Sequence, residues 1–279
     1  MRTKRKLRIS PWAIILIIFI AVLSIFLFKA CSAAKPPEEL PVFGPPPAMG
    51  PRYKPGPLTI EDKIDIFSRF NDVTIDDYPK SMIELYERNP ETEEFVLNYP
   101  LLKDSESEID LSEYENCSSV PLIMQWDTRW GYKMYGDDIF GLTGCGPTCL
   151  SMVAIYLLQD TTYDPAYIAN YSIENGHCVE GNGTAWTLMS EGGEDLGMDV
   201  TEIPLVEQRI IDNLEVGNPI ICVVGPGNFT TTGHFIIMTG YEDGLIRIND
   251  PNSKANSEKL WAYDDIYDEI RNLWVFRTE

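Results

Sequence analysis

Hydrophobic and polar positions divide the chain into four stretches with different patterns. Trp12–Phe28 is an apolar run without a charged residue, and it follows a basic N-terminal stretch. Residues 35–57 contain nine prolines, which disfavour helix and central strand and predict an extended linker. Residues 58–118 repeat apolar side chains at helical spacing, whereas residues 119–279 mix helical and strand patterns. The predicted organisation is a cytoplasmic basic tail with a transmembrane anchor (1–34), a linker (35–57), a helical extension (58–118) and a globular domain (119–279).

The helical extension is acidic and predicts three helices. The first contains Ile64–Phe70, the second Ser81–Tyr86 and the third Pro90–Tyr99. Proline is typical of a helix start, and we expect Pro100 to end the third helix. No cluster of catalytic residue types falls in this segment. We therefore expect it to pack on the domain that follows, with a partner-docking or regulatory module as the alternative.

The globular domain places most of its helices before most of its strands. This order predicts an α+β fold with a mostly antiparallel sheet. The expected strands 234–241 and 245–249 flank a short turn, so we expect them to form a hairpin. The expected helices are 147–158, 185–196 and 206–214, and the expected strands are 120–124, 199–203, 219–224, 234–241, 245–249 and 272–277.

The N-terminal stretch predicts how the chain is placed relative to a membrane. The apolar run of 17 residues is near the short limit of a membrane span, which needs about 17–25 residues. Basic residues before the run and an acidic remainder after it predict a cytoplasmic N-terminus and a domain outside the cell membrane. We favour an uncleaved single-pass anchor. The alternatives are cleavage near Ala34, which would give a secreted form, and lipidation of Cys31.

Charge and histidine content exclude several classes of function. The chain has 22 Lys and Arg against 43 Asp and Glu, a formal net charge of −21. A surface this acidic repels phosphates, so we expect no nucleic-acid partner. No G-x-x-x-x-G-K-[ST] segment occurs, so we expect no nucleotide either. The only histidines are His177 and His234, too few for a zinc site with several histidine ligands, and His177 lies in a polar loop typical of a structural residue.

Cys145 has the surroundings expected of a nucleophile. It lies in the segment Gly144–Thr148, directly before an apolar helix whose first turn contains Pro147. The positive end of the helix dipole and its free N–H groups stabilise a thiolate. The flanking glycines leave room for a substrate backbone. Taken alone, the segment is equally consistent with an ordinary helix-start turn.

The predicted hairpin supplies two partners for this cysteine. A three-residue loop, Glu242–Gly244, would set Asp250 across from Ile236 and diagonal to His234, on one face of the sheet. The carboxylate of Asp250 would then orient the imidazole, as the third member of a nucleophile–base–orienter set does. Asn249 is the neighbouring competitor, but it faces the other side of the sheet in this register.

Four motifs, in this order, resemble the C-39-like branch of papain-fold cysteine peptidases: Gln125–Trp130, Gly144–Thr148, Gly233–Phe235 and Asn249–Pro251. Better-known relatives in this branch trim double-glycine leader peptides in bacteriocin exporters. The resemblance covers about residues 119–279 and leaves the helical extension out. It implies a papain-like fold, in which a helix carrying the nucleophile packs on an antiparallel sheet.

The resemblance also implies a role for each candidate residue. Cys145 would be the nucleophile, and His234 the general base and acid. Asp250 would orient His234, and Gln125 would be an oxyanion-hole donor, although it lies 20 residues before the cysteine instead of a few. The implied activity is hydrolysis of a peptide or protein substrate without a metal or other cofactor. The alternatives are a papain-like cell-wall amidase of the CHAP or NlpC type, and a catalytically silent peptide-binding module.

Cysteines outside a cell invite disulfides. Cys145 must stay a free thiol for the proposed chemistry, and Cys149 is expected to be buried one helical turn later. Among the others outside the anchor, at most one bridge can form, and the sequence does not select it. These others are Cys117, Cys178 and Cys222.

Overall fold

The computed structural model describes residues 56–278, apart from position 182. From Pro57 onward the chain forms one compact unit, so the helical extension and the globular domain fold together. No helix among the described residues has the length and apolar character needed to cross a membrane. The predicted anchor (1–34) and nearly all of the linker (35–57) lie outside the described residues.

Short 3₁₀ helices alternate with α-helices in the extension. Its elements are α2 (Ile60–Ser68), η1 (Ile75–Asp77), α3 (Lys80–Arg88), η2 (Pro90–Thr92) and α4 (Glu93–Leu102). The Thr59 hydroxyl accepts from the Asp62 N–H while the Asp62 carboxylate accepts from the Thr59 N–H, a capping box that starts α2. Helix α4 runs two residues past Pro100, so the prediction that Pro100 ends it is wrong. Pro100 has no N–H to donate, so α4 lacks the bond to the Val96 carbonyl oxygen and continues for only two more residues.

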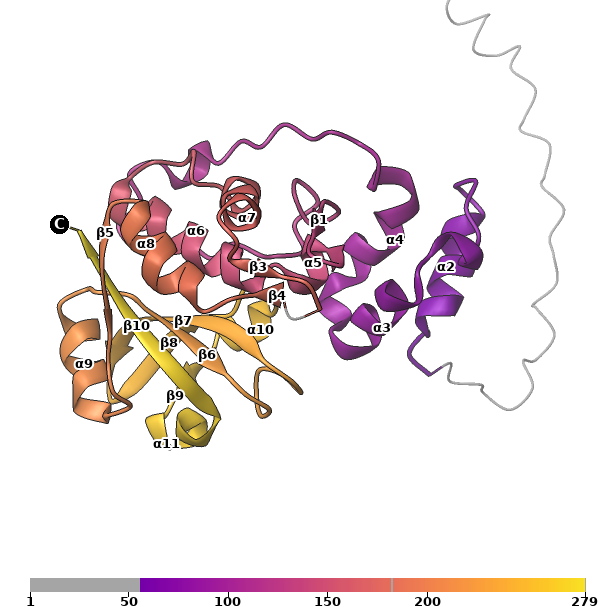
Figure 1. Ribbon diagram of the computed structural model, residues 1–279. Helices are drawn as coiled ribbons and strands as arrows, with labels where there is room; N and C mark the ends of the chain where they lie inside the picture. Colours follow the sequence, from indigo (N-terminus) through magenta and orange to yellow (C-terminus); the bar gives the residue numbers. More distant parts are fainter. Residues whose placement is uncertain (1–55, 182, 279) are drawn as a thin grey trace, which may run out of the picture. The chain divides into compact units, whose positions relative to one another are not determined.

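The extension packs on the domain through an apolar core. Leu85 of α3 and Phe95 of α4 are buried together with Tyr132 and Ile139 of the domain. The Phe95 and Tyr132 rings stack at 4.3 Å, and the Tyr132 hydroxyl donates to the Phe95 carbonyl oxygen at 2.8 Å. Figure 1 shows α2, α3 and α4 beside the first elements of the domain, as their apolar spacing leads us to expect.

The first half of the domain is mainly helical. Its elements are β1 (Met134–Tyr135), β2 (Asp138–Ile139), α5 (Phe140–Thr143), α6 (Cys145–Leu158), α7 (Pro165–Glu174), β3 (Cys178–Val179), β4 (Gly183–Thr184), the π-helical turn η4 (Leu188–Gly192) and α8 (Gly193–Asp195), and η3 (Ser112–Tyr114) precedes them at the end of the extension. Every residue from Gly146 to Ile155 of α6 is buried. A helix that is apolar on all sides must be surrounded by protein, and α6 is accordingly the central helix.

The second half is an antiparallel sheet of six strands in the order β5-β10-β6-β7-β8-β9. The predicted α+β class with an antiparallel sheet is therefore confirmed. The elements are β5 (Met198–Glu202), α9 (Glu207–Glu215), β6 (Ile220–Val224), β7 (His234–Glu242), β8 (Leu245–Asn249), α10 (Lys254–Ser257), β9 (Leu260–Trp261), α11 (Tyr263–Ile266), η5 (Tyr267–Glu269) and β10 (Ile270–Thr278).

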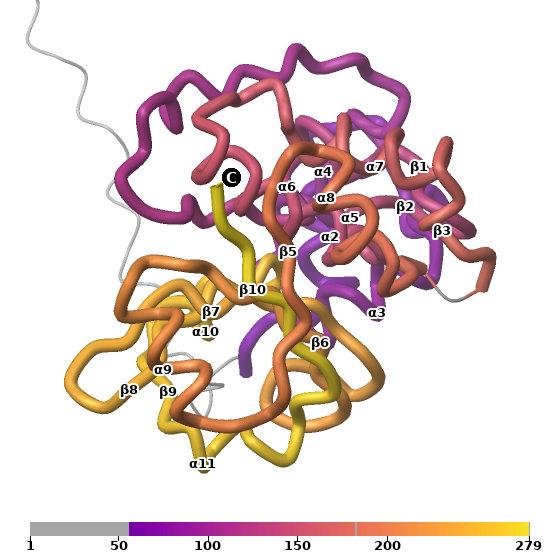
Figure 2. The backbone as a smooth tube through the Cα atoms, turned by 60° about the vertical axis from the view of Figure 1, so that its left-hand side comes forward, coloured from indigo at the N-terminus to yellow at the C-terminus, as the bar shows by residue number. Residues whose placement is uncertain are grey.

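Side chains of the central strands point alternately into two apolar cores. On β6, Ile221 and Val223 pack in the core that contains α6, whereas Ile220 and Cys222 pack in the core that contains α9 and α11. Figures 1 and 2 show the sheet between these two groups of helices, with α6, α7 and α8 on one side. Because both faces are covered, every residue of β6 is buried.

The turn of the β7–β8 hairpin is shorter than predicted. Glu242 pairs with Leu245, so the loop consists of Asp243 and Gly244 alone and the predicted three-residue loop is wrong. Both loop residues have positive φ, 51° and 84°, which is what a two-residue turn of type I′ requires.

A bulge in β7 restores the predicted register farther along the hairpin. Met238 pairs with Ile248 and Gly240 pairs with Arg247, and these two residues of β8 are consecutive. Thr239 is therefore an extra residue without a partner in β8. Beyond it, Ile237 pairs with Asn249. The next residue, Asp250, therefore continues to the position across from Ile236, which is where the sequence predicts it.

Residues 120–124 do not form the predicted strand. The Asn249 side chain donates to the carbonyl oxygens of Val120 and Pro121, at 3.2 and 2.9 Å. The Gln125 N–H donates to the Pro251 carbonyl oxygen at 2.8 Å. Pro121 has no N–H to offer a ladder, so single side-chain and backbone bonds tie this segment to the end of β8.

Candidate active site

Cys145 is the first residue of α6, which begins two residues earlier than the predicted helix 147–158 and keeps Cys145 at the helix N-terminus. Gly144 is the N-cap residue, and no side chain caps this end of the helix. The first N–H groups of α6 are therefore free to stabilise a negative charge. A Cβ atom on Gly146 would lie 2.6 Å from the Thr184 side chain, so this glycine allows β4 to approach the helix start closely.

The surroundings of Cys145 favour its thiolate. Burial raises the pKa of the Cys145 thiol, but the hydrogen bond with His234 and the charge of His234 lower it. Backbone N–H groups of Phe235 and Gly146 lower it further, so the pKa lies below its ordinary value. Burial raises the pKa of Cys149, one turn later, well above that value. Of these two cysteines on α6, Cys145 is the one whose surroundings favour the thiolate.

His234 is the first residue of β7 and bridges Cys145 and Asp250. Its Nε2 lies 2.8 Å from Oδ1 of Asp250, which leaves Nδ1 as the ring nitrogen for Cys145. Burial lowers the pKa of His234, but the charge and hydrogen bond of Asp250 and the contact with Cys145 raise it to about 10. His234 is 7% exposed and Asp250 is 0% exposed, so the pair is shielded from water.

The loop after β8 holds Asp250 in place. Oδ1 of Asp250 accepts from the Asn252 N–H and Oδ2 from the Asn256 side chain, each at 2.9 Å. The Asp250 N–H donates to the Ser257 hydroxyl, also at 2.9 Å. Burial raises the pKa of Asp250, but the charge of His234 and these hydrogen bonds lower it below its ordinary value. The carboxylate therefore stays ionised beside the imidazole.

A carboxylate of the helical extension anchors the same loop. Glu91, in η2, accepts from the Ser253 hydroxyl at 2.7 Å, the Lys254 N–H at 2.9 Å and the Ala255 N–H at 3.3 Å. It thereby caps the start of α10, four residues after Asp250. Sequence reasoning missed Glu91, because its partners are more than 160 residues away and no local pattern marks it.

Gln125 is buried and lines a cavity together with Cys145. It is 3% exposed, and its Nε2 donates to the Gly141 carbonyl oxygen at 2.8 Å. The Gln125 Oε1 has no hydrogen-bond partner among the described residues. An amide Nε2 carries two hydrogens, so one N–H remains beyond the bond to Gly141. Gln125 lines the same cavity as Cys145 and His234, which is the placement that the family resemblance implies.

Asn249 and His177, the alternatives to Asp250 and His234, make their contacts elsewhere. Asn249 holds the segment before Gln125, as described above, and it is not bonded to His234. His177 lies with its Nδ1 2.8 Å from the Thr187 hydroxyl, and its ring stacks on Tyr171 at 5.9 Å. His177 is therefore a structural residue, as expected from its sequence context.

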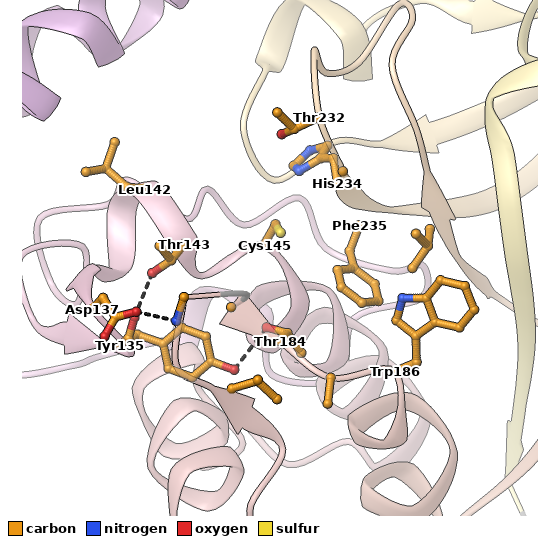
Figure 3. Close-up of a pocket in the computed structure, with 16 residues that line it drawn as sticks. Tyr135, Asp137, Leu142, Thr143, Cys145, Thr184, Trp186, Thr232, His234 and Phe235 are labelled. Atoms are coloured by element: carbon orange, nitrogen blue, oxygen red, sulfur yellow. Dashed lines mark hydrogen bonds between the residues drawn. The ribbon is translucent and has the colours of Figure 1, made fainter.

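Cys145 and His234 lie where two cavities meet. The larger, of about 760 Å³, is bounded by the β1–β2 and β3–β4 hairpins and by Trp186. Figure 3 shows this side, with the Cys145 sulfur below the His234 ring and Trp186 beyond Phe235. The smaller cavity, of about 360 Å³, lies between α3 and the loop 227–233. An extended peptide that occupied both cavities would pass the Cys145 sulfur.

The described cysteines are all free thiols: Cys117, Cys145, Cys149, Cys178 and Cys222. No disulfide therefore joins any two of these five. Within residues 56–278, position 182 excepted, no group of three or more His, Cys, Asp or Glu side chains is arranged to hold a metal ion. Of the tryptophans near the site, Trp130 is fully buried, whereas Trp186 is 48% exposed and faces the larger cavity.

Known proteins resemble the chain over its globular domain. The model of the Peptidase_C39 like family matches residues 117–276. The peptidase domain of Streptococcus ComA, a bi-functional ABC transporter involved in quorum sensing, is 20% identical, covers 57% of this chain and 99% of that domain, and superposes with a TM-score of 0.42. A C39-like protein of Bacillus anthracis is 15% identical, covers 58% of this chain and 96% of its own, and has a TM-score of 0.40. No curated protein matches the chain.

Proposed function

Because the chain belongs to the Peptidase_C39 like family, as its motifs predict, we propose that its domain hydrolyses peptide bonds with Cys145 as the nucleophile. His234 acts as general base and acid, and Asp250 orients His234. The observation that carries this proposal is the buried series of contacts from Asp250 through His234 Nε2, at 2.8 Å, to Cys145. A thiol of lowered pKa beside an imidazole of raised pKa is the arrangement that an activated thiolate needs.

The first half of the reaction is acylation of Cys145. The thiolate attacks the carbonyl carbon of the scissile amide, a C–S bond forms, and the carbonyl electrons move onto the oxygen. The free amide N–H of Gln125 and the Cys145 backbone N–H donate to this oxyanion. As the C–N bond breaks, His234 Nδ1 gives its proton to the leaving amine. Asp250 keeps the Nε2–H of the ring in place throughout.

The second half is hydrolysis of the thioester. Neutral His234 takes a proton from a water molecule while the water oxygen attacks the thioester carbonyl. The C–S bond then breaks, the carboxylic acid product leaves, and the thiolate of Cys145 is restored beside the imidazolium. Every proton in this cycle moves through Nδ1, because Nε2 is held by Asp250.

The experiment that tests the proposal presents peptide libraries and purified cell wall to the full chain side by side. The expected result is cleavage of peptides by the wild type and none by Cys145→Ala, with the two proteins melting at the same temperature. Cleavage of cell wall alone would replace the proposal by an amidase function. Peptide binding without cleavage would replace it by a silent binding module.

We also propose that the domain lies outside the cell membrane, held by a single-pass anchor near the cytoplasmic N-terminus. The support is in the sequence, where five basic and no acidic residues precede Ile9. Protease added to intact cells should then remove the domain while a cytoplasmic marker survives. Protection of the domain until the cells are lysed would contradict this placement.

A further inference from the structure

Helix α3 of the extension forms one wall of the smaller cavity. Leu85, Arg88 and Asn89 are spaced i, i+3 and i+4, so they share one face of the helix. This face lines the cavity together with Cys145 and His234. The three residues lie outside the match of the family to residues 117–276. The extension therefore brings its own side chains to the cleft of the nucleophile.

The position of this wall is fixed by direct contacts with the loop that follows Asp250. The Asn89 side chain donates to the Asn252 carbonyl oxygen at 2.5 Å. Two residues later, Glu91 caps α10 through the bonds described above. The end of α3 and the catalytic loop are thus parts of one framework, and Arg88 immediately precedes the anchoring asparagine.

Among residues 56–278, position 182 excepted, Arg88 is the only Lys, Arg, Asp or Glu side chain that lines the smaller cavity. Its Nε donates to the Glu84 carbonyl oxygen at 3.1 Å, while the Glu84 carboxylate pairs with Lys80 at 2.6 Å. The Arg88 guanidinium forms no ion pair with any described residue, so its two Nη groups are open to a partner. A guanidinium presents its donors in a fork that matches a carboxylate.

The charge of Arg88 stands out against its surroundings. From Gly56 onward the chain has 41 acidic residues against 13 Lys and Arg. The larger cavity has the opposite charge, because Asp137 is the only Lys, Arg, Asp or Glu among the described residues that line it. The Asp137 carboxylate accepts from the Gly181 N–H, and the Arg88 Nε donates to the Glu84 carbonyl oxygen, so each side chain has one hydrogen bond and no ion pair among the described residues. The two cavities beside Cys145 therefore differ in the sign of their charged side chain, and the two Nη groups of Arg88 remain for a partner.

We propose that the smaller cavity is a subsite for an acidic residue of the substrate, whose carboxylate binds Arg88. This inference rests on the proposed peptidase activity and deepens it by naming a substrate class. Neutral donors beside the arginine, the hydroxyls of Thr230 and Thr232, line the same cavity and suit an anionic side chain. The helical extension is then a specificity-determining part of the enzyme.

The main test uses a peptide that the wild type cleaves, remade with Glu, Gln or Lys at each position around the scissile bond. At one position, Glu should be cleaved about 1.5- to fivefold faster than Gln, the range expected for an ion pair with an exposed arginine. Arg88→Glu should reverse this order in favour of Lys, and Arg88→Gln should abolish it. Arg69→Glu, a matched charge reversal at an exposed arginine outside the cavity, should keep the wild-type order. The same order in wild type and Arg88→Glu at every position would overturn the subsite.

A second measurement reads the charge of the cavity without any turnover. Iodoacetate is anionic and iodoacetamide is neutral, so the ratio of their rates at Cys145 reports the local potential. Arg88→Glu should lower this ratio about two- to fivefold at low salt, and Arg69→Glu should leave it unchanged. An unchanged ratio in Arg88→Glu would overturn the subsite. If the wild type cleaves no peptide, the proposed function fails, and this ratio still decides whether Arg88 acts on an anion at Cys145.

Discussion

Replacing Glu91 by alanine tests whether the helical extension supports the active site. The substitution removes three contacts, to the Ser253 hydroxyl at 2.7 Å and to the N–H groups of Lys254 and Ala255 at 2.9 and 3.3 Å. Loss of a capping side chain costs about 0.5–2 kcal/mol, and Glu91 is half-buried, so we expect the free energy of unfolding to fall by about 1–2 kcal/mol. The loop that holds Asp250 would then be free to depart from its catalytic position.

The free energy lost on replacing Glu91 by alanine also sets the expected loss of activity. If restoring the loop during catalysis costs about 1–2 kcal/mol, kcat/KM falls by roughly 5- to 30-fold. The measurements are chemical denaturation and peptide hydrolysis on Glu91→Ala and Glu91→Gln, where the amide keeps one acceptor and should lie between alanine and wild type. Glu94→Ala is the matched control, because Glu94 is an exposed carboxylate three residues away that makes no side-chain hydrogen bond among the described residues. Glu91→Ala with the wild-type kcat/KM would refute the reasoning, even if its stability were reduced.

The remaining predictions concern the residues proposed for catalysis and the neighbouring Asn249. Asp250→Ala should lower kcat by roughly two to four orders of magnitude, since the imidazole loses its orienter. Asn249→Ala should instead lower the free energy of unfolding by about 1–3 kcal/mol in denaturant titrations and keep the kcat of the folded protein. Loss of kcat in Asn249→Ala, with kcat kept in Asp250→Ala, would show that Asn249 is the orienter and Asp250 is not. Gln125→Ala should reduce kcat by roughly 10²- to 10³-fold with little change in KM, and an unaltered kcat would remove it from the oxyanion site. The pH profile of kcat/KM should be a bell: activity is lost below the lowered pKa of Cys145, and again as pH rises through about 10, where His234 loses its proton.

The register of the catalytic hairpin could be predicted even though its turn could not. Asp250 lies where the sequence predicts it because two departures cancel. The turn has one residue fewer than expected, and the bulge at Thr239 adds one residue to β7. A bulge depends on the packing of both strands, so no local pattern in the sequence marks it. Cys145 was easier to place, since glycine and proline at a helix start act locally.

Contacts between distant segments account for what the sequence did not reveal. Glu91 and Arg88 belong to a helical segment whose own pattern indicates only helices. Their roles depend on the docking of that segment against a loop more than 160 residues later. The burial of Gln125 likewise depends on the backbone of Pro251, at the far end of the domain. Such contacts follow from tertiary packing and carry no periodic signal.

The central claim is that Cys145 is a thiolate paired with the His234 imidazolium, and the pH profile of Cys145 alkylation tests it most directly. Iodoacetamide reacts with the thiolate. Tandem mass spectrometry locates the label on Cys145, on Cys149 of the same peptide, or on Cys222. For the wild type, the half-maximal rate should fall below about pH 7.5, as for other His-paired cysteines at helix starts. In His234→Ala, the partner charge is lost, and the midpoint should move to about 8.5 or above. Superimposable profiles for the two proteins would contradict the ion pair and with it the catalytic assignment.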